Sequence, residues 1–276
     1  MTRPFRWIAL AAAASGVAIA ALPLFARQDA PPKTQIQPNT ETFDALPVPD
    51  GAPAEIKTLI ADLATEGVRV DFAAKVVEVR GVILLDRMNA GYPIEYLIVT
   101  QGGFTHESLG MVRCTPSKLN AAFLALGLTP GKSVRFIKKD PPPPVEKLMS
   151  GEAREFDVVA PEGPIVDIGV KWTDDEGEHM HSIEDLIRYV TNDRALPRRA
   201  FVYVGSRFTR VVIGKDKTEK YLADVEGNIT SLYLSGTGNC LFDMNSAEGV
   251  ESYLYDVNPA VCPPRGTKVT FVFALR

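Results

Sequence analysis

The chain has 276 residues, 46% of them hydrophobic and 23% charged, with a formal net charge of −4. This composition is that of a globular protein and excludes intrinsic disorder for most of the chain. The mild acidity, with no long block of Lys or Arg, also argues against a protein that binds nucleic acid or an anionic lipid surface.

Residues 1–26 have the layout of a secretory signal peptide. Arg3 and Arg6 form a basic start, residues 7–25 are apolar, and Ala26 provides a small residue at a cleavage position. We expect cleavage here, export to the periplasm or the extracellular side, and no stable membrane insertion afterwards. A retained anchor is the alternative, because the apolar stretch is nearly as long as a transmembrane helix.

The rest of the chain divides by composition. Residues 27–52 are rich in Pro, Gln, Thr and Asp and predict a flexible linker. Residues 53–276 predict a folded domain. The run DPPPP at 140–144 cannot enter a helix interior or a sheet ladder, so it indicates an exposed loop. This loop could separate two lobes, 53–139 and 145–276.

Three helices are expected in chain order. Apolar residues recur at helical spacing over 54–66 and again over 115–127, where Thr115 is a capping candidate. A third helix is expected to open at Ser182, with Asp185 completing a capping box.

Strands make up most of the remaining pattern. The double glycine 102–103 predicts a tight turn that folds 104–112 back, antiparallel, on 92–100. The expected fold class is therefore α+β, with mostly antiparallel sheets and three or more helices packed on them. The predicted strands are 68–72, 75–85, 92–100, 104–112, 133–138, 156–159, 165–172, 201–204, 207–213, 221–224, 231–235 and 267–275.

The stretch FTHESLG, residues 104–110, contains the main candidate site. In a strand, His106 and Ser108 would share one face and Glu107 would point the other way. A two-residue turn would place Glu95 on the face of His106, and a three-residue turn would place it with Glu107. Ser108, His106 and Glu95 could then act as nucleophile, base and orienting acid. The alternative is a buried histidine bonded to backbone or to a glutamate.

Two further histidines suggest a metal site. In an extended segment, His179 and His181 would share a face, as in some metal centres, with Asp174 and Glu176 nearby. A divalent metal is therefore possible there or with His106. The alternative is a solvated polar turn.

The chain has three cysteines, Cys114, Cys240 and Cys262. In an exported protein they permit one disulfide, and we predict Cys240–Cys262, with three buried thiols as the alternative. An iron–sulfur cluster is disfavoured because it usually requires four thiolates.

Several short motifs occur in order along the chain. They are EYLIVT (95–100), GFTHESL (103–109), TPSKLNAAFLALGLTPG (115–131), VGSRF (204–208), ADVEG (223–227) and PPRGTKV (263–269). Together these motifs resemble those of the YdjY domain family of exported bacterial proteins. The resemblance implies export and a shared site around Glu95, His106, Glu107, Ser108, Arg207 and Asp224, but no reaction.

The predicted function is that of a non-enzymatic binding module in the periplasm or at the cell surface. Its partner would be a small molecule or an envelope protein. The motivation is that a cluster of polar residues exists without a complete catalytic set. The alternative is a metal-dependent or serine-type hydrolase centred on His106.

Overall fold

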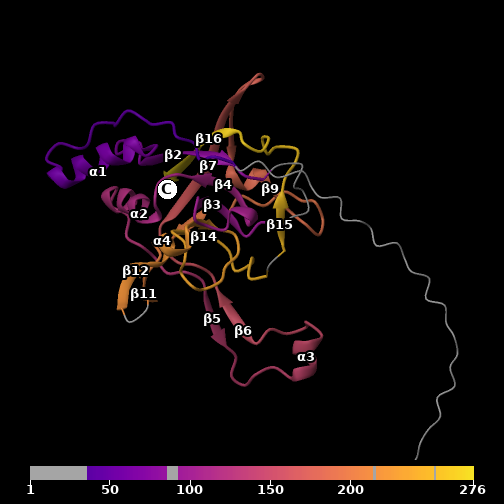
Figure 1. Ribbon diagram of the computed structural model, residues 1–276. Helices are drawn as coiled ribbons and strands as arrows, with labels where there is room; N and C mark the ends of the chain where they lie inside the picture. Colours follow the sequence, from indigo (N-terminus) through magenta and orange to yellow (C-terminus); the bar gives the residue numbers. More distant parts are fainter. Residues whose placement is uncertain (1–35, 86–92, 214–215, 252) are drawn as a thin grey trace, which may run out of the picture. The chain divides into compact units, whose positions relative to one another are not determined.

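The computed structural model describes residues 36–85, 93–213, 216–251 and 253–276. The predicted signal peptide therefore lies outside the described residues. Most of the regular structure is β (Figure 1). Within the described ranges, no helix is long and apolar enough to cross a membrane.

Eight strands close into a barrel. Their order around it is β2-β16-β7-β10-β14-β13-β3-β4, and β4 pairs back with β2 to close the ring. β1 and β8 extend the sheet, pairing with β2 and β7. The bounds are β1 Val68–Asp71, β2 Val76–Ile83, β3 Tyr96–Thr100, β4 Ser108–Val112, β7 Ile165–Asp174, β8 Gly177–Ser182, β10 Phe201–Tyr203, β13 Asn228–Ser231, β14 Phe242–Met244 and β16 Lys268–Leu275.

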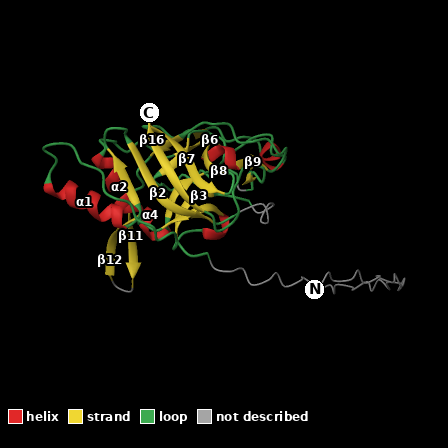
Figure 2. Ribbon diagram, turned by 90° about the horizontal axis from the view of Figure 1, so that it is seen from above, coloured by secondary structure: helices red, strands yellow, loops and turns green. Residues whose placement is uncertain are grey.

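The predicted α+β class is wrong, because a closed barrel buries its apolar face inside itself and needs no layer of helices to cover it. The described residues contain four α-helices, and α1 and α2 lie side by side next to the strands (Figure 2). The predicted helix after Ser182 is a single 3-10 turn with the expected capping box, followed by a strand. The predicted strand 221–224 is largely helical. The helices are α1 Ala54–Thr65, α2 Pro116–Ala125, α3 Val145–Met149 and α4 Leu222–Glu226.

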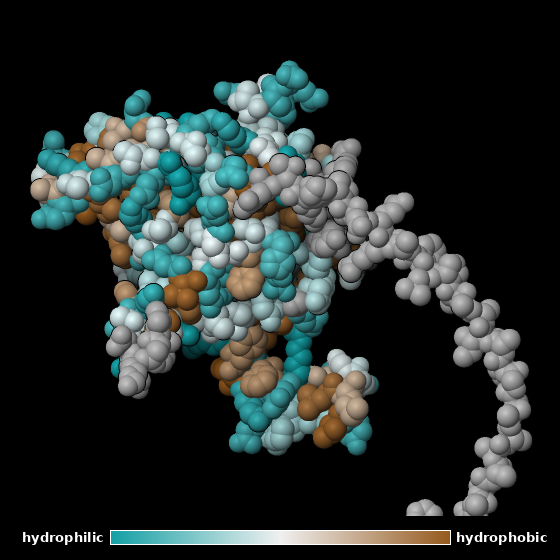
Figure 3. Space-filling model, in the orientation of Figure 1, coloured by the Kyte–Doolittle hydropathy of each residue, from teal (hydrophilic) through white to brown (hydrophobic). Residues whose placement is uncertain are grey.

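Three strand pairs lie outside the barrel. The pair β5–β6 forms an arm that carries α3, and the arm exposes apolar side chains, including Phe136 and Met149 (Figures 1 and 3). The loop 140–144 lies on this arm and is largely exposed, as predicted. The pairs are β5 Arg135–Lys138 with β6 Phe156–Val159, β9 Ile187–Tyr189 with β15 Tyr255–Val257, and β11 Phe208–Ile213 with β12 Asp216–Tyr221.

The suggested lobes 53–139 and 145–276 are not separate. Residues 36–276 form one compact unit. The reason is topological, since β16, from the second half of the sequence, pairs along its length with β2 from the first half. Removing either half would leave the barrel open.

Residues 36–52, expected from sequence to be part of a flexible linker at 27–52, are ordered against the barrel. Asn39 is 3% exposed, and its amide donates to the carbonyl of Gly81 at 3.2 Å. The backbone N–H of Phe43 donates to a carbonyl of α1. Polar composition misled the prediction, because hydrogen bonds hold this segment, together with Ile36 and Val48, which pack against the core.

The strands β3 and β4 are parallel, with Tyr96 opposite Ser108, so the predicted antiparallel hairpin is wrong. Parallel neighbours usually need a connection of about a dozen residues or more. Here residues 101–107 make the whole crossover. The ring of Phe104 stacks on Tyr96, with centroids 5.4 Å apart, as the chain returns across β3.

The barrel interior is packed with aromatic rings. Phe242 on β14 and Phe273 on β16 lie 5.2 Å apart between ring centroids, and Phe123 of α2 packs edge-on against both. Phe271 fills the seam where β2 meets β4, because Gly81 and Gly110 present no side chain there. The core therefore depends on small residues at the seam and large ones opposite.

One carboxyl group is buried beside this core. Asp243 on β14 is 5% exposed and accepts hydrogen bonds from the Ser133 hydroxyl at 2.5 Å and the Val134 N–H at 3.4 Å. Removal from water raises the pKa of Asp243, and the two hydrogen bonds offset only part of this effect.

Substituting Asp243→Asn should change how stability depends on pH. An acid whose pKa is raised in the folded state binds its proton more tightly when the protein is folded. Its contribution to the free energy of unfolding is therefore lost as the pH rises from 3.8 through the raised pKa. The unfolding free energy of the wild type minus that of the variant should therefore fall across this window and then stay flat. Urea denaturation at a series of pH values measures it, and a difference independent of pH would contradict the prediction.

Candidate functional site

His106 lies in a 3-10 turn, Thr105–Glu107, and not in the strand expected from sequence. Its side chain is 72% exposed, and its Nε2 lies 2.7 Å from Oε1 of Glu107. The two neighbours can pair because a turn does not send successive side chains to opposite faces. The buried histidine that sequence offered as an alternative is therefore not observed.

Ser108 begins β4 and is fully buried. Its hydroxyl donates to the carbonyl of Phe104 at 2.6 Å, which stabilises the crossover. The backbone N–H of Glu95 donates to the carbonyl of Glu107 at 3.0 Å. The structure thus brings Glu95, His106 and Glu107 to one place, at the start of the two parallel strands, while the Ser108 hydroxyl is committed to the backbone.

Arg207 and Asp224 take part in other contacts. Arg207 Nε donates to the carbonyl of Thr237 at 2.7 Å, and its own carbonyl accepts from the N–H of Leu222 in α4. Asp224 on α4 accepts from the N–H of Ser117 in the first turn of α2 at 2.8 Å. It therefore caps α2, a role that sequence assigned to Thr115, whose side chain makes no such bond.

Removing this cap, by Asp224→Ala, should lower the free energy of unfolding by about 1 kcal/mol, because an N–H at the start of α2 loses its acceptor. The variant Asp224→Asn keeps a side-chain oxygen and should lose less. Chemical denaturation of the two variants tests the assignment. Equal losses for both would show that the oxygen at this position is not what stabilises α2.

His179 and His181 share a face of β8, as expected from sequence for an extended segment. Both rings stack on Trp172, at 4.9 and 5.2 Å between centroids, and lie 6.4 Å from each other. His179 Nε2 lies 2.8 Å from Asp174 Oδ1, and this hydrogen bond lowers the pKa of Asp174. In the described part of the chain, no three His, Cys, Asp or Glu side chains are grouped to hold a metal ion.

The cysteines are present as thiols, so the predicted Cys240–Cys262 bond is not formed in the described structure. Cys240 is fully buried in the core, whereas the Cys262 thiol donates toward the carbonyls of Leu85 and Pro263, each at 3.6 Å. Burial raises the pKa of Cys114 to about 12 and that of Cys240 above its usual value. Proximity in sequence was a poor guide to proximity in space.

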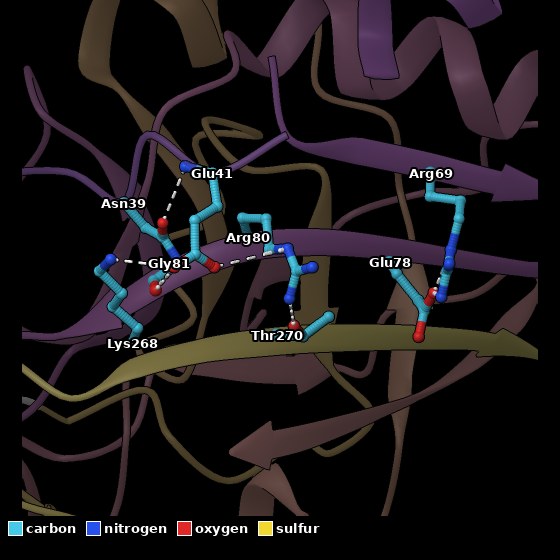
Figure 4. Close-up of polar contacts among 8 residues, drawn as sticks. All are labelled: Asn39, Glu41, Arg69, Glu78, Arg80, Gly81, Lys268 and Thr270. Atoms are coloured by element: carbon cyan, nitrogen blue, oxygen red, sulfur yellow. Dashed lines mark hydrogen bonds and ion pairs between the residues drawn. The ribbon is translucent and has the colours of Figure 1, made fainter. Parts of the chain in front are cut away.

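A pocket of about 370 Å³ lies on the outer face of the barrel, over β2, β16 and β7 (Figure 4). Sequence analysis did not predict it. Four cationic side chains and three carboxylates contribute to its wall, together with the ring of Phe43. The lining residues are Asn39, Glu41, Phe43, Arg69, Glu78, Arg80, Lys171, Trp172, Thr173, Glu178, Lys268, Val269 and Thr270.

The floor of the pocket is a row of three residues. Arg80, Thr270 and Lys171 are directly opposed on β2, β16 and β7. Opposed side chains on antiparallel strands point to the same face, so the three stand together. Arg80 Nη1 donates to the Thr270 hydroxyl at 3.0 Å (Figure 4). Thr270 acts there as an acceptor, which leaves its own proton to donate elsewhere.

Two carboxylates, Glu78 and Glu41, pair with different cations of the pocket. Glu78 accepts from Arg69 Nε at 2.6 Å and lies 3.5 Å from Lys171 Nζ. Glu41 accepts from Lys268 Nζ at 2.9 Å, and this hydrogen bond is the main reason why the pKa of Glu41 is lowered. Glu78 lies on β2 of the barrel, whereas Glu41 comes from the ordered segment before the barrel.

Residues 39–43, called the strap from here on, form one wall. The ring of Phe43 lies beneath two guanidinium groups, 4.0 Å from that of Arg80 and 4.7 Å from that of Arg69. Arg80 Nε is buried without a hydrogen-bond partner among the described atoms, and Glu41 Oε2 is 4.0 Å away, too far for a hydrogen bond. The strap therefore orients Arg80 but does not provide a hydrogen-bond acceptor for its Nε.

Part of this pocket could have been found in the sequence. The strands 75–85 and 267–275 alternate between apolar residues and charged or polar residues, including Glu78, Arg80 and Lys268. That pattern predicts a charged outer face. It does not indicate that the two strands are neighbours, nor that the strap crosses them.

A family model for the YdjY domain matches residues 68–274, and the chain belongs to this family, as its motifs suggested. No curated protein and no solved structure matches the chain. The cationic residues of the pocket lie inside the matched region. The strap lies before it.

Proposed function

We propose that the protein is an exported, non-enzymatic binding module whose ligand site is the pocket over β2, β16 and β7. The observation that carries the proposal is Arg80, which is held by Phe43 and Thr270 at the base of a pocket of about 370 Å³ and keeps unused donors. The volume is within the usual range for small-molecule sites. A small molecule fits a concave site of this size better than an envelope protein does.

Catalysis at His106 has less support. Its imidazole pairs with Glu107 in an exposed turn, and the adjacent Ser108 hydroxyl is buried and bonded to the backbone. A serine nucleophile needs its hydroxyl within reach of the base and open to substrate. Neither condition is met by this arrangement, which favours binding over hydrolysis.

Export is supported by the basic start and apolar run of residues 1–26. Cell fractionation of the full-length protein tests it. Recovery of a shortened chain outside the cytoplasm is expected. A full-length chain that stays in the cytoplasm would contradict export.

A thermal-shift screen tests the pocket as the ligand site. The panel should include sugars, amino acids, carboxylates and phosphate, each applied to the wild type and to an Arg80→Gln, Lys171→Gln double variant. Because binding to the folded state alone stabilises it, at least one class should raise the melting temperature of the wild type and not of the double variant. Lys147→Gln, an exposed change on α3 away from the pocket, is the control. Compounds that stabilise both proteins equally would place the site elsewhere.

A further inference from the structure

We propose that the pocket binds a small organic molecule through a single carboxylate group, which takes the place of Glu41 against Arg80 and Lys268. This inference rests on the pocket being the ligand site, as proposed above. It adds the chemical class of the ligand and the way in which the chain itself competes for the site.

The unused donors of Arg80 provide the first argument. Within the described residues its guanidinium makes one hydrogen bond, to Thr270, and its Nε is buried with no acceptor. A buried donor without a partner is unfavourable, and an acceptor brought by a ligand would remove that penalty. One face of the guanidinium is covered by the ring of Phe43, so an incoming group must approach its edge. A planar carboxylate matches that edge with two parallel hydrogen bonds.

The charges in the pocket provide the second argument. Its lining has four cations, Arg69, Arg80, Lys171 and Lys268, against the carboxylates of Glu41, Glu78 and Glu178, a balance of +1. When the ligand displaces Glu41, the same four cations face only Glu78 and Glu178, a balance of +2. The charges therefore favour an anion in that place, and the anion that the chain itself puts there is a carboxylate, that of Glu41.

The most exposed ion pair of the pocket marks the place of exchange. The side chains of Lys268 and Glu41 are 63% and 46% exposed, and a pair this open to solvent contributes little to stability. The carboxylate of Glu78, in contrast, is 13% exposed and accepts from Arg69. A ligand carboxylate can therefore displace Glu41 more easily than Glu78, and on doing so it reaches the edge of Arg80 beside Thr270.

Isothermal titration calorimetry measures binding directly. Titration at constant ionic strength should use benzoate, its neutral isostere benzamide, and inorganic phosphate. Benzoate should bind with an affinity at least about tenfold higher than that of benzamide or phosphate, since the carboxylate forms charge-assisted hydrogen bonds.

Variants identify the groups involved. Arg80→Gln should weaken benzoate binding at least about tenfold, and Arg80→Lys should also weaken it because the two-pronged edge is lost. Glu41→Gln should strengthen it severalfold, since the competing carboxylate is removed. Lys147→Gln should leave it unchanged. If Arg80→Gln does not fold, the opposite effects of Glu41→Gln, which should strengthen binding, and Lys268→Gln, which should weaken it, still provide the test, because both side chains are exposed.

Failure of this inference can be told from failure of the proposed function. Equal binding of benzoate and benzamide, or tighter binding of phosphate, would overturn the carboxylate class and leave the pocket as the ligand site. Weaker binding by Glu41→Gln would overturn the displacement of Glu41. If no compound in the thermal-shift panel depends on Arg80 and Lys171, the proposed function itself fails.

Discussion

Replacing Phe271 by alanine is expected to lower the free energy of unfolding by about 3–5 kcal/mol, the usual range for deleting a buried phenylalanine ring. The ring is fully buried, and it fills the space left open by two glycines. A Cβ at Gly81 or at Gly110 would lie within 2.5 Å of it. Neither glycine has a side chain that could move into the hole, so we expect a cavity to remain.

The position of the ring makes this loss informative. Gly81 and Gly110 belong to β2 and β4, the two strands that close the barrel. Urea denaturation of Phe271→Ala should be compared with that of Phe208→Ala, whose ring is 67% exposed and should matter little. Similar losses in the two variants would mean that the closing seam is not sealed by Phe271.

Replacing Gly103 by alanine should lower the free energy of unfolding by about 1–3 kcal/mol, as overpacking does in well-packed cores. A Cβ there would lie 2.6 Å from the carbonyl oxygen of Gly227 and 2.9 Å from the Cβ of Val99. The first of these neighbours is backbone and cannot rotate away. The crossover between β3 and β4 would have to shift, and the turn with His106 would shift with it.

The neighbouring Gly102 provides a matched control. A Cβ on this residue would meet no atom within 4 Å. Gly102→Ala should therefore leave stability nearly unchanged, although it is the same substitution one residue earlier. Thermal denaturation of both variants measures the difference. If the two variants melt together, close packing at Gly103 does not limit the crossover.

The elements were predicted better than their arrangement. The helices at 54–66 and 115–127 correspond to α1 and α2, because helical periodicity is a local property. The strand 75–85 contains β2 for the same reason. The pairing of β3 with β4 was predicted in the wrong direction, because a double glycine between two apolar runs is the usual mark of a hairpin. Nothing local shows that residues 101–107 return to the start of β3 before β4 begins.

The candidate site was predicted in part for a related reason. Glu95, His106 and Glu107 come together, although the faces assigned to them assumed a strand where the chain turns. The pocket over β2, β16 and β7 was missed, because its floor joins residues from distant parts of the chain, such as Arg80 and Thr270. Local patterns cannot reveal such neighbours. The strap was missed because its order comes from hydrogen bonds and ring contacts with charged side chains, which composition does not record.

The place of β16 determines when this fold can be completed. This strand lies far along the chain from β2, yet it pairs with β2 on one side and β7 on the other, and Arg80 bonds to Thr270 across a separation of 190 residues. Until β16 is in place, both neighbouring strands have an open edge. Contacts this distant in sequence also form slowly. The barrel therefore cannot close before β16 has paired on both sides, and a chain without it keeps two strand edges open to pairing with other chains.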